Sequence, residues 1–269
     1  IYFRGASATL DSTIVAGNQA EEGGGIYGFG NVAWNGPMTI QRSAIISNTA
    51  SLNGGGLNGY CLDAFLENTT VSGNKANQDG AGIYMDYHSL FKLFNVTVRN
   101  NTADSDDNGN GMGGGVVLDD TSDLELRNSI IAGNDDLTAG PFEAYLPDCS
   151  GALTSKGYNL IGLVSAGCTI SGDMLGVQKG SVFPGLDARL GPLTNSYSTY
   201  YHPPLMGPIV DRGNPAGCVD HLGAALPTDQ RGEDRIYGAS ISGYNERCDL
   251  GAVESWIRVF EIMLPLLRR

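Results

Sequence analysis

One acidic segment of the chain has the spacing of a calcium-binding loop. Asp104, Asp106 and Asn108 alternate and are followed by Gly109, which matches the first half of such a loop. Carboxylates on alternate residues of a tight turn can converge on one cation. The bidentate glutamate expected six residues after the glycine is absent, because Gly115 stands there. We therefore expect a solvated acidic loop, with calcium at Asp104, Asp106 and Asn108 as the weaker alternative.

A second acidic group has the residue type that performs acid–base chemistry on polysaccharides. It consists of Asp119, Asp120 and Asp123. Polysaccharide-cleaving enzymes built on β-helices combine such carboxylates with a cationic base or charge stabiliser. The cationic residues that could serve here are Lys75, Lys92, Arg99 and Arg127. Because the acidic clusters do not recur on successive repeats, we expect plain surface charge and no enzymatic activity.

These acidic segments lie on either side of one copy of a repeated phrase, which consists of glycines followed by an apolar residue. Ahead of each copy, a short apolar strand ends in Asn. The glycine motifs start at Gly23, Gly54, Gly80 and Gly113, and the strands end at Asn18, Asn48, Asn74, Asn101 and Asn134. The fifth strand, which ends at Asn134, has no clean glycine partner. A period in this range predicts an array of stacked structural repeats.

The repeats predict an all-β fold, a parallel β-helix in which each repeat forms one turn. Alternating apolar residues indicate strands with one face inward, and no helical segment separates them. Glycine suits stacked corners that need positive φ and leave no room for Cβ. Stacked Asn amides can bond to the turns above and below. A β-propeller needs a longer period, and no leucine-rich phrase recurs.

Composition and charge narrow the function classes. The chain has 269 residues, of which 39 are Gly, and a net charge of −13. This acidity argues against nucleic acid and anionic membranes as partners. No apolar run reaches the ~18 residues needed to span a bilayer. A phosphate-binding loop is also excluded, because the glycine motifs lack a following Lys-Ser/Thr and helix.

The five cysteines indicate disulfides and an oxidising compartment. Cys149, Cys168, Cys218 and Cys248 bracket two segments, which favours the pairs Cys149–Cys168 and Cys218–Cys248. Sequence alone allows three pairings of these four residues. Cys61 would remain a free and buried thiol.

The C-terminal half contains several distinctive phrases. They include Asp148-Cys149-Ser150, Gly157-Tyr158-Asn159-Leu160-Ile161-Gly162, Leu190-Gly191-Pro192-Leu193 and Cys248-Asp249-Leu250-Gly251. Their wording and order resemble the C-terminal region of bacterial "choice-of-anchor Q domain" proteins, and the repeats resemble those of polymorphic outer-membrane proteins. The resemblance implies a right-handed β-helix, a secreted or cell-surface location and no catalytic residues.

The predicted organisation has three parts. Residues 1–147 form the repeats, 148–254 a disulfide-pinned region that continues and caps the helix, and 255–269 an apolar strand or tail. The chain departs from the family pattern between 194 and 209, where an aromatic loop could contact a ligand. Its residues are Tyr197, Tyr200 and Tyr201.

The two chain ends favour self-assembly. Both read as apolar strands, and the open ends of a β-helix pair with another chain unless they are capped. Head-to-tail contact would then build a homopolymeric fibre, tube or sheath. The predicted contact residues are Ile1, Tyr2, Phe3, Trp256, Ile257, Val259, Phe260, Ile262 and Leu264. The alternatives are a carbohydrate-active enzyme and a monomeric adhesin that binds surface polysaccharide.

Overall fold

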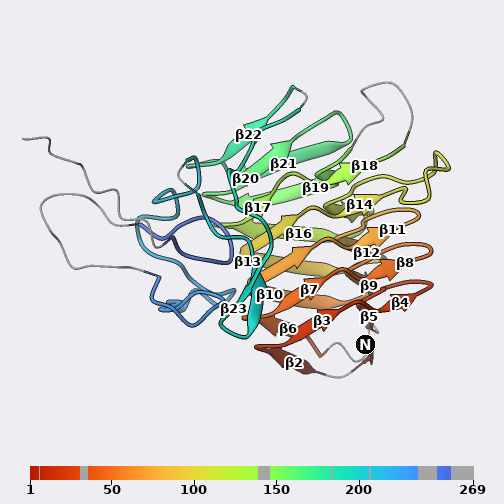
Figure 1. The fold of residues 1–269 in the computed structure, drawn as a ribbon, viewed down its shortest axis with the longest axis horizontal. Coiled ribbons are helices and arrows are strands. Elements are labelled where there is room, and N and C mark those ends of the chain that lie inside the picture. Colours follow the sequence, from red (N-terminus) through yellow and green to blue (C-terminus); the bar gives the residue numbers. More distant parts are fainter. Residues whose placement is uncertain are drawn as a thin grey trace, which may run out of the picture.

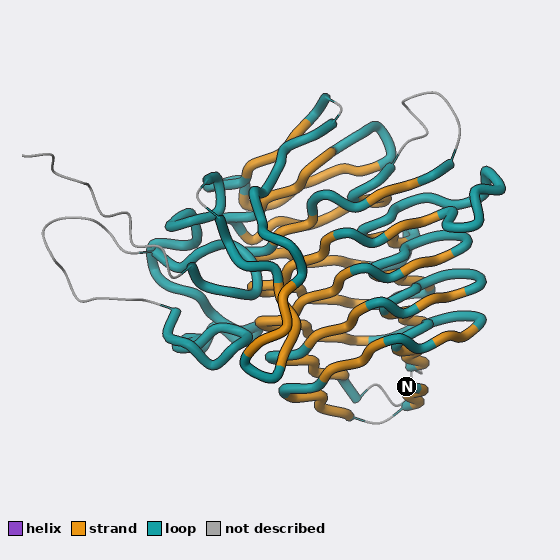
Figure 2. Tube along the Cα trace, viewed as in Figure 1, coloured by secondary structure: helices purple, strands orange, loops and turns teal. Residues whose placement is uncertain are grey.

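The chain forms a parallel β-helix with an irregular region along one side (Figures 1 and 2). The computed structural model describes residues 1–5, 7–30, 36–138, 146–182, 184–205, 207–235 and 247–255. Within these ranges the regular structure is strand, and no segment is helical. Every strand pair in the coil is parallel, as a stack of like turns requires.

Each turn contributes to three sheets. Sheet A holds β1 (Tyr2–Arg4), β5 (Ile26–Phe29), β9 (Leu57–Tyr60), β12 (Ile83–Asp86), β15 (Val116–Leu118) and the start of β19 (Cys149–Lys156). Sheet B holds β2 (Ala8–Asp11), β3 (Ile14–Ala16), β6 (Met38–Gln41), β7 (Ala44–Ile46), β10 (Asp63–Ser72), β13 (Leu90–Arg99), β16 (Asp123–Arg127), β17 (Ile130–Ile131), the rest of β19, β20 (Leu160–Leu163), β21 (Cys168–Asp173) and β22 (Gln178–Gly180). Sheet C holds β4 (Gln19–Ala20), β8 (Thr49–Ala50), β11 (Lys75–Ala76), β14 (Thr102–Ala103) and β18 (Asp135–Asp136). An antiparallel hairpin, β23 (Thr194–Ser196) and β24 (Thr199–Tyr201), lies outside the coil.

The glycine motif forms the corner that leads into sheet A, and its glycines serve two purposes. The first glycine has positive φ, as at Gly54 (φ 68°). The third has no room for a side chain, since a Cβ on Gly56 would lie 2.6 Å from the carbonyl oxygen of Gly82. The predicted roles of these glycines are therefore confirmed, and they explain why the turns stack so closely.

The asparagines that end the repeated strands form a buried ladder. The Nδ2 of Asn48 donates to Oδ1 of Asn74 at 3.0 Å, and Asn74 donates likewise to Asn101 at 2.9 Å. The backbone N–H of each asparagine donates to the same oxygen of the next one. The ladder starts at Asn18 and passes through Asn134 to Asp148. It satisfies polar groups that the corner would otherwise bury without partners.

The coil continues past the last glycine motif. Pro147 and Cys149 occupy the next corner: the N–H of Gly115 donates to the carbonyl of Pro147 at 2.8 Å, and Cys149 pairs in register with Val116. Strand pairing then continues to Gly180. The first part of the region expected at 148–254 thus extends the coil, and the remainder leaves it.

The described residues between 186 and 255, here called the lateral region, lie along sheet B rather than over an end of the coil (Figure 1). Asn68, Asn95 and Asn128 occupy equivalent bends of three successive turns, each with positive φ. Their side-chain amides contact the lateral region: Asn68 donates to the carbonyl of Thr228 at 2.9 Å and Asn95 to that of Val219 at 3.1 Å.

Apolar contacts and two disulfides complete this arrangement. A second core joins Ile130 and Leu160 of the coil to Leu190, Ile209 and Leu250. The disulfides Cys149–Cys168 and Cys218–Cys248 are present, and Cys61 is a buried free thiol. Both predicted pairings are confirmed.

Candidate functional site

The outer face of sheet A carries a ladder of aromatic rings. Strand register places Phe29 next to Tyr60 on adjacent turns. Their ring centroids lie 5.2 Å apart, and Tyr87 stacks on Tyr60 at 5.0 Å. Tyr87 ends this stack and is 48% exposed. The stack therefore presents an aromatic platform to solvent at that end.

Two carboxylates lie beside Tyr87. Asp86 ends β12 and Asp119 directly follows β15, and the register of Met85 with Leu118 places the two acids on adjacent turns. A side-chain hydrogen bond links Asp86 to Asp119. The backbone N–H of Tyr87 donates to Asp86 at 2.9 Å and to Asp119 at 3.3 Å. The two acids and the ring thus form one compact group.

The environment moves the pKa values of the two acids in opposite directions. Burial, followed by the charge of Asp119, raises the pKa of Asp86. Burial also acts on Asp119, but hydrogen bonds from Ser122 and Thr121 outweigh it and lower the pKa of Asp119. When the pair shares one proton, Asp86 is therefore the donor and Asp119 the acceptor.

The pKa of Tyr84 is sensitive to the negative charges on the outer face of sheet A. Burial and then the nearby carboxylate of Asp86 raise the pKa of Tyr84 to about 12. Burial and then Glu21 raise the pKa of Glu22 on the same face. Carboxylates and tyrosine hydroxyls together provide hydrogen-bond acceptors and donors beside the aromatic platform.

The structure does not gather the predicted acidic and cationic residues into one constellation. Lys92 lies on sheet B, where its Nζ is 3.5 Å from Glu125, and Arg127 lies over Phe94 on the same sheet. Asp123 begins β16 of sheet B, Asp120 is exposed in the preceding turn, Lys75 lies on sheet C, and Arg99 ends β13 beside Gly133.

The acid that does accompany Asp119 is Asp86, which the sequence reasoning missed. A signal existed, because each follows the first glycine of its motif by six residues, from Gly80 and Gly113. A single acid thus recurs on the preceding turn, whereas Asp123 aligns with Leu90, so the cluster as a whole does not recur there.

The acidic loop at 104–109, for which calcium was the weaker alternative, forms hydrogen bonds within itself, and Asp104 in it is buried rather than solvated. The carboxylate of Asp104 is buried and accepts the backbone N–H groups of Asn108 and Gly109 at 3.0 Å each. The Nδ2 of Asn108 donates to Asp106 at 2.9 Å. In the described residues, no group of three His, Cys, Asp or Glu side chains could hold a metal ion. The three predicted ligands thus bond to one another and to their own backbone.

The predicted tyrosine loop is an antiparallel hairpin whose three tyrosines differ in exposure. Tyr197 lies at its tip and is 49% exposed, whereas Tyr201 is buried and its hydroxyl bonds to Ser196 Oγ at 2.7 Å. The carbonyl of Tyr200 accepts from Gln230 at 2.9 Å. The guanidinium of Arg231 lies over the rings of Tyr197 and Tyr201. The hairpin thus packs on the lateral region.

The predicted assembly residues are only partly described. Ile1 and Tyr2 are exposed, and Phe3 packs partly buried against the core. The remaining residues, Trp256, Ile257, Val259, Phe260, Ile262 and Leu264, lie outside the described residues. In the part of the chain that the structure covers, no helical segment has the length and apolar character needed to cross a membrane.

Comparison with known proteins agrees with this architecture. Residues 1–173 match the family described as the right-handed β-helix region. No curated protein and no solved structure matches the chain. Since the matched segment covers more than half of the chain and ends within β21, the chain belongs to the right-handed β-helix family.

Proposed function

We propose that this protein is a non-catalytic glycan-binding protein that recognises an extended polysaccharide along the outer face of sheet A. The observation that carries the proposal is the group formed by Tyr87, Asp86 and Asp119, where an exposed ring at the end of a stack meets two hydrogen-bonded carboxylates. A sugar ring packs its C–H face on an aromatic ring, and its hydroxyls donate to carboxylates.

The ligand that suits this face is neutral or amine-bearing. Negative charge from Asp86, Asp119 and Glu22 would repel a polyanion, and the pKa of Asp86 is itself raised by burial and then by the charge of Asp119. The direction of the aromatic stack favours an extended ligand, because its rings follow the axis of the coil over successive turns. A linear polymer aligned with that axis could contact several turns at once.

The spacing of the acids favours binding over hydrolysis. Two-carboxylate glycosidases separate their acids by about 5–5.5 Å when retaining and about 6.5–9.5 Å when inverting. The side chains of Asp86 and Asp119 are close enough to interact through a hydrogen bond, which is closer than either of these arrangements. Enzymatic cleavage is the alternative, and release of reducing ends from a polysaccharide panel would support it.

Binding of soluble neutral and chitosan-type polysaccharides by affinity electrophoresis tests the proposal. Tyr87→Ala should weaken binding roughly three- to tenfold through the lost ring contact, and Asp119→Asn about tenfold through lost charge-assisted hydrogen bonds. Tyr197→Ala is the matched control, because Tyr197 is equally exposed but lies on the lateral region. Loss of binding in the control instead, or no binding to any polymer, would overturn the assignment.

An extracellular setting belongs to the same proposal, and two disulfides support it. The narrower resemblance to choice-of-anchor Q proteins, bacterial surface location and head-to-tail assembly stay predictions. Electron microscopy of the protein with and without residues 255–269 tests assembly: fibres that persist after the deletion would contradict the predicted contact.

A further inference from the structure

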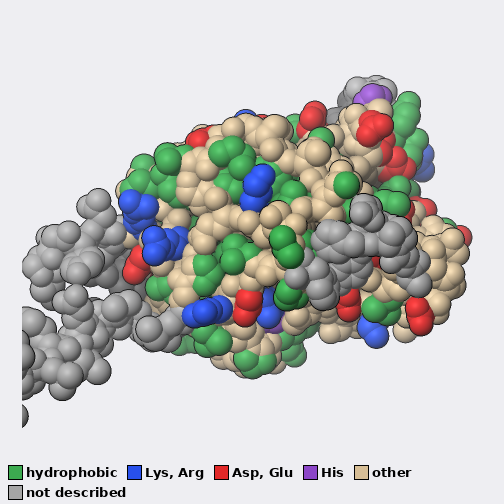
Figure 3. Space-filling model, turned by 90° about the horizontal axis from the view of Figure 1, so that it is seen from above, with side chains coloured by type: hydrophobic (Ala, Val, Ile, Leu, Met, Phe, Trp, Pro, Cys, Tyr) green, Lys and Arg blue, Asp and Glu red, His purple; other side chains and the backbone are tan. Residues whose placement is uncertain are grey.

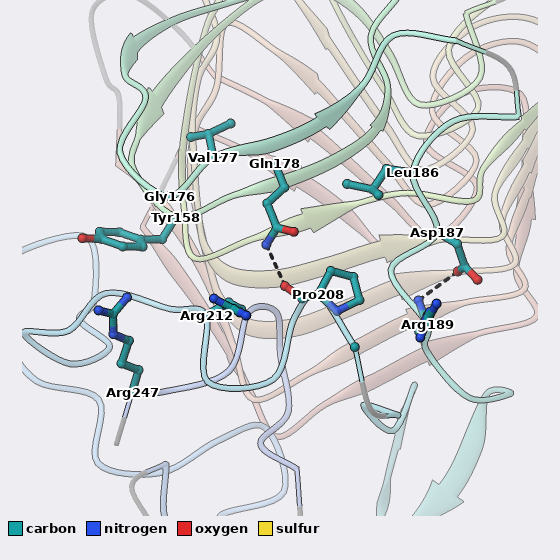
Figure 4. A pocket seen from close by; sticks show the side chains of 11 residues that line it. Tyr158, Gly176, Val177, Gln178, Leu186, Asp187, Arg189, Pro208, Arg212 and Arg247 are labelled. Atoms are coloured by element: carbon teal, nitrogen blue, oxygen red, sulfur yellow. Dashed lines mark hydrogen bonds between the residues drawn. The ribbon is translucent and has the colours of Figure 1, made fainter. Parts of the chain in front are cut away.

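A pocket of about 830 Å³ lies where the lateral region meets the last turns of the coil (Figure 4). Its walls come from both parts: Tyr158 and Gln178 belong to the coil, and Arg189, Arg212 and Arg247 to the lateral region. This volume lies within the range of about 300–1,000 Å³ that small-molecule sites occupy. The pocket is separate from sheet A.

Three guanidinium groups line this pocket, and in the described ranges none of them forms a short ion pair, although the charge of Arg212 acts on the neighbouring carboxylate of Asp211. The ion pairs that those residues form include none of Arg189, Arg212 and Arg247. Asp187 also lines the pocket, and its Oδ1 accepts the backbone N–H of Arg189 at 2.8 Å. Even with Asp187 and the neighbouring Asp211 counted, cations exceed carboxylates here.

This excess stands out against the rest of the molecule. The chain carries a net charge of −13, so most of its surface repels anions. In Figure 3, several Lys and Arg side chains gather toward the side that carries the lateral region, whereas Asp and Glu are more frequent on the opposite side. A local positive site on an acidic protein can select an anion that the remaining surface does not attract.

The walls of the pocket are fixed before any ligand binds. The ring of Tyr158 packs against Gly176, where a Cβ would lie 2.4 Å from its Cδ1, so only glycine lets the ring occupy this wall. The Nε2 of Gln178 donates to the carbonyl of Pro208 at 2.6 Å and thereby links coil and lateral region across the pocket. A preformed site loses less entropy on binding.

The arginines are distributed over two sides of the pocket. Figure 4 shows Arg212 and Arg247 on the side of Tyr158, and Arg189 on the side of Asp187. Guanidinium groups bind carboxylate and phosphate through paired hydrogen bonds. We propose that this pocket binds a small anion with two negatively charged carboxylate or phosphate groups, one held by Arg212 and Arg247 and the other by Arg189.

Isothermal titration calorimetry at low ionic strength with citrate, pyrophosphate and neutral sucrose tests this site. Citrate and pyrophosphate share the required charge and distinguish carboxylate from phosphate, so the stronger of the two identifies the ligand class. We expect Arg212→Gln and Arg247→Gln each to weaken binding at least about tenfold, as for hydrogen bonds to charged groups. Sucrose should not bind.

Lys75→Gln is the matched control, because it removes one positive charge from an exposed position on sheet C. It should leave anion binding unchanged, and so should Asp119→Asn on sheet A, which separates this site from the glycan face. The proposal is overturned if neither anion binds at millimolar concentration. It is also overturned if the arginine variants bind as well as the Lys75→Gln control.

Discussion

Asp148 ends the asparagine ladder by accepting from Asn134: its Oδ1 receives Nδ2 at 2.9 Å and the backbone N–H at 3.1 Å. Its Oδ2 accepts the N–H of Leu163 at 2.7 Å. All three partners donate, so a carboxylate suits this last position. Earlier positions must also donate to the next turn, which only an amide can do.

Aspartate should therefore be tolerated at the end of the ladder and not within it. At position 74 the side chain donates to Asn101 at 2.9 Å and to the carbonyl of Ile45 at 3.0 Å. Asn74→Asp loses both bonds and buries a charge, so we expect a loss of about 3 kcal/mol or more. Asp148→Asn places an amide NH2 opposite one of the N–H groups that now donate to the carboxylate, and this should cost about 1–2 kcal/mol. Urea unfolding measures both, and equal losses would contradict the directional ladder.

The Cys218–Cys248 disulfide should stabilise the lateral region more than the coil. Its 30-residue separation predicts about 3–4 kcal/mol from restriction of the unfolded chain. The double variant Cys218→Ala/Cys248→Ala should expose the lateral region to protease at lower urea concentrations. Cys61→Ala, which removes a buried thiol outside any disulfide, is the control. Identical cleavage of both variants would argue against this role.

His202 should make the protein sensitive to acid. Its Nδ1 lies 2.8 Å from the carbonyl of Gly191, so Nδ1 carries the proton and Nε2 accepts from Ser72 Oγ at 2.8 Å. Burial lowers the pKa of His202 to about 4. The unfolded state, with a pKa near 6.5, takes up the proton first, so this contribution is complete above about pH 6.5 and is lost as the pH falls toward 4.

The expected size of this loss is about 3 kcal/mol over that window. Unfolding free energies at pH 7 and pH 4 should differ less in His202→Gln than in the parent protein. His88→Gln is the control, since His88 is exposed on the other side of the coil. An unchanged pH dependence in His202→Gln would exclude His202 as the titrating group.

Arg235 should contribute more to stability than its partner Glu254. Arg235 is 1% exposed and donates to Asn68 Oδ1 and, at 2.9 Å, to the carbonyl of Gly251. Burial and then the charge of Asp249 raise the pKa of Glu254 to about 9, which offsets much of the benefit of its ion pair with Arg235. Glu254→Gln should therefore cost less than about 1 kcal/mol, whereas Arg235→Met leaves the buried oxygens of Asn68 and Gly251 without their donor and should cost about 2–4 kcal/mol. The opposite order in thermal unfolding would contradict this ranking.

The coil could be predicted from the sequence because its information is local and repeated. Each asparagine of the ladder ends the same phrase, so a single pattern fixes corner, strand and side-chain partner. The pair Asp86 and Asp119 was harder to find, because spacings of 26 and 33 residues between motifs obscure which positions align.

The lateral region could not be placed because its contacts are distant in sequence. Asn68 and Thr228, for example, are 160 residues apart, and no repeated pattern links them. Arg235 lies in an irregular segment of the sequence, yet it is buried and donates to Asn68 of the coil. The arginine pocket forms only where the lateral region packs on the coil, so its lining residues could not be predicted from the sequence either.

The amides of Asn68, Asn95 and Asn128 give the lateral region a mechanical consequence. A bare stack of turns yields to tension by peeling one turn from its end at a time. Here the lateral region crosses three turns of the coil, and one asparagine of each turn donates a hydrogen bond to it. Tension on the coil is shared among those turns, so they should yield together, at a higher force than any single turn would withstand.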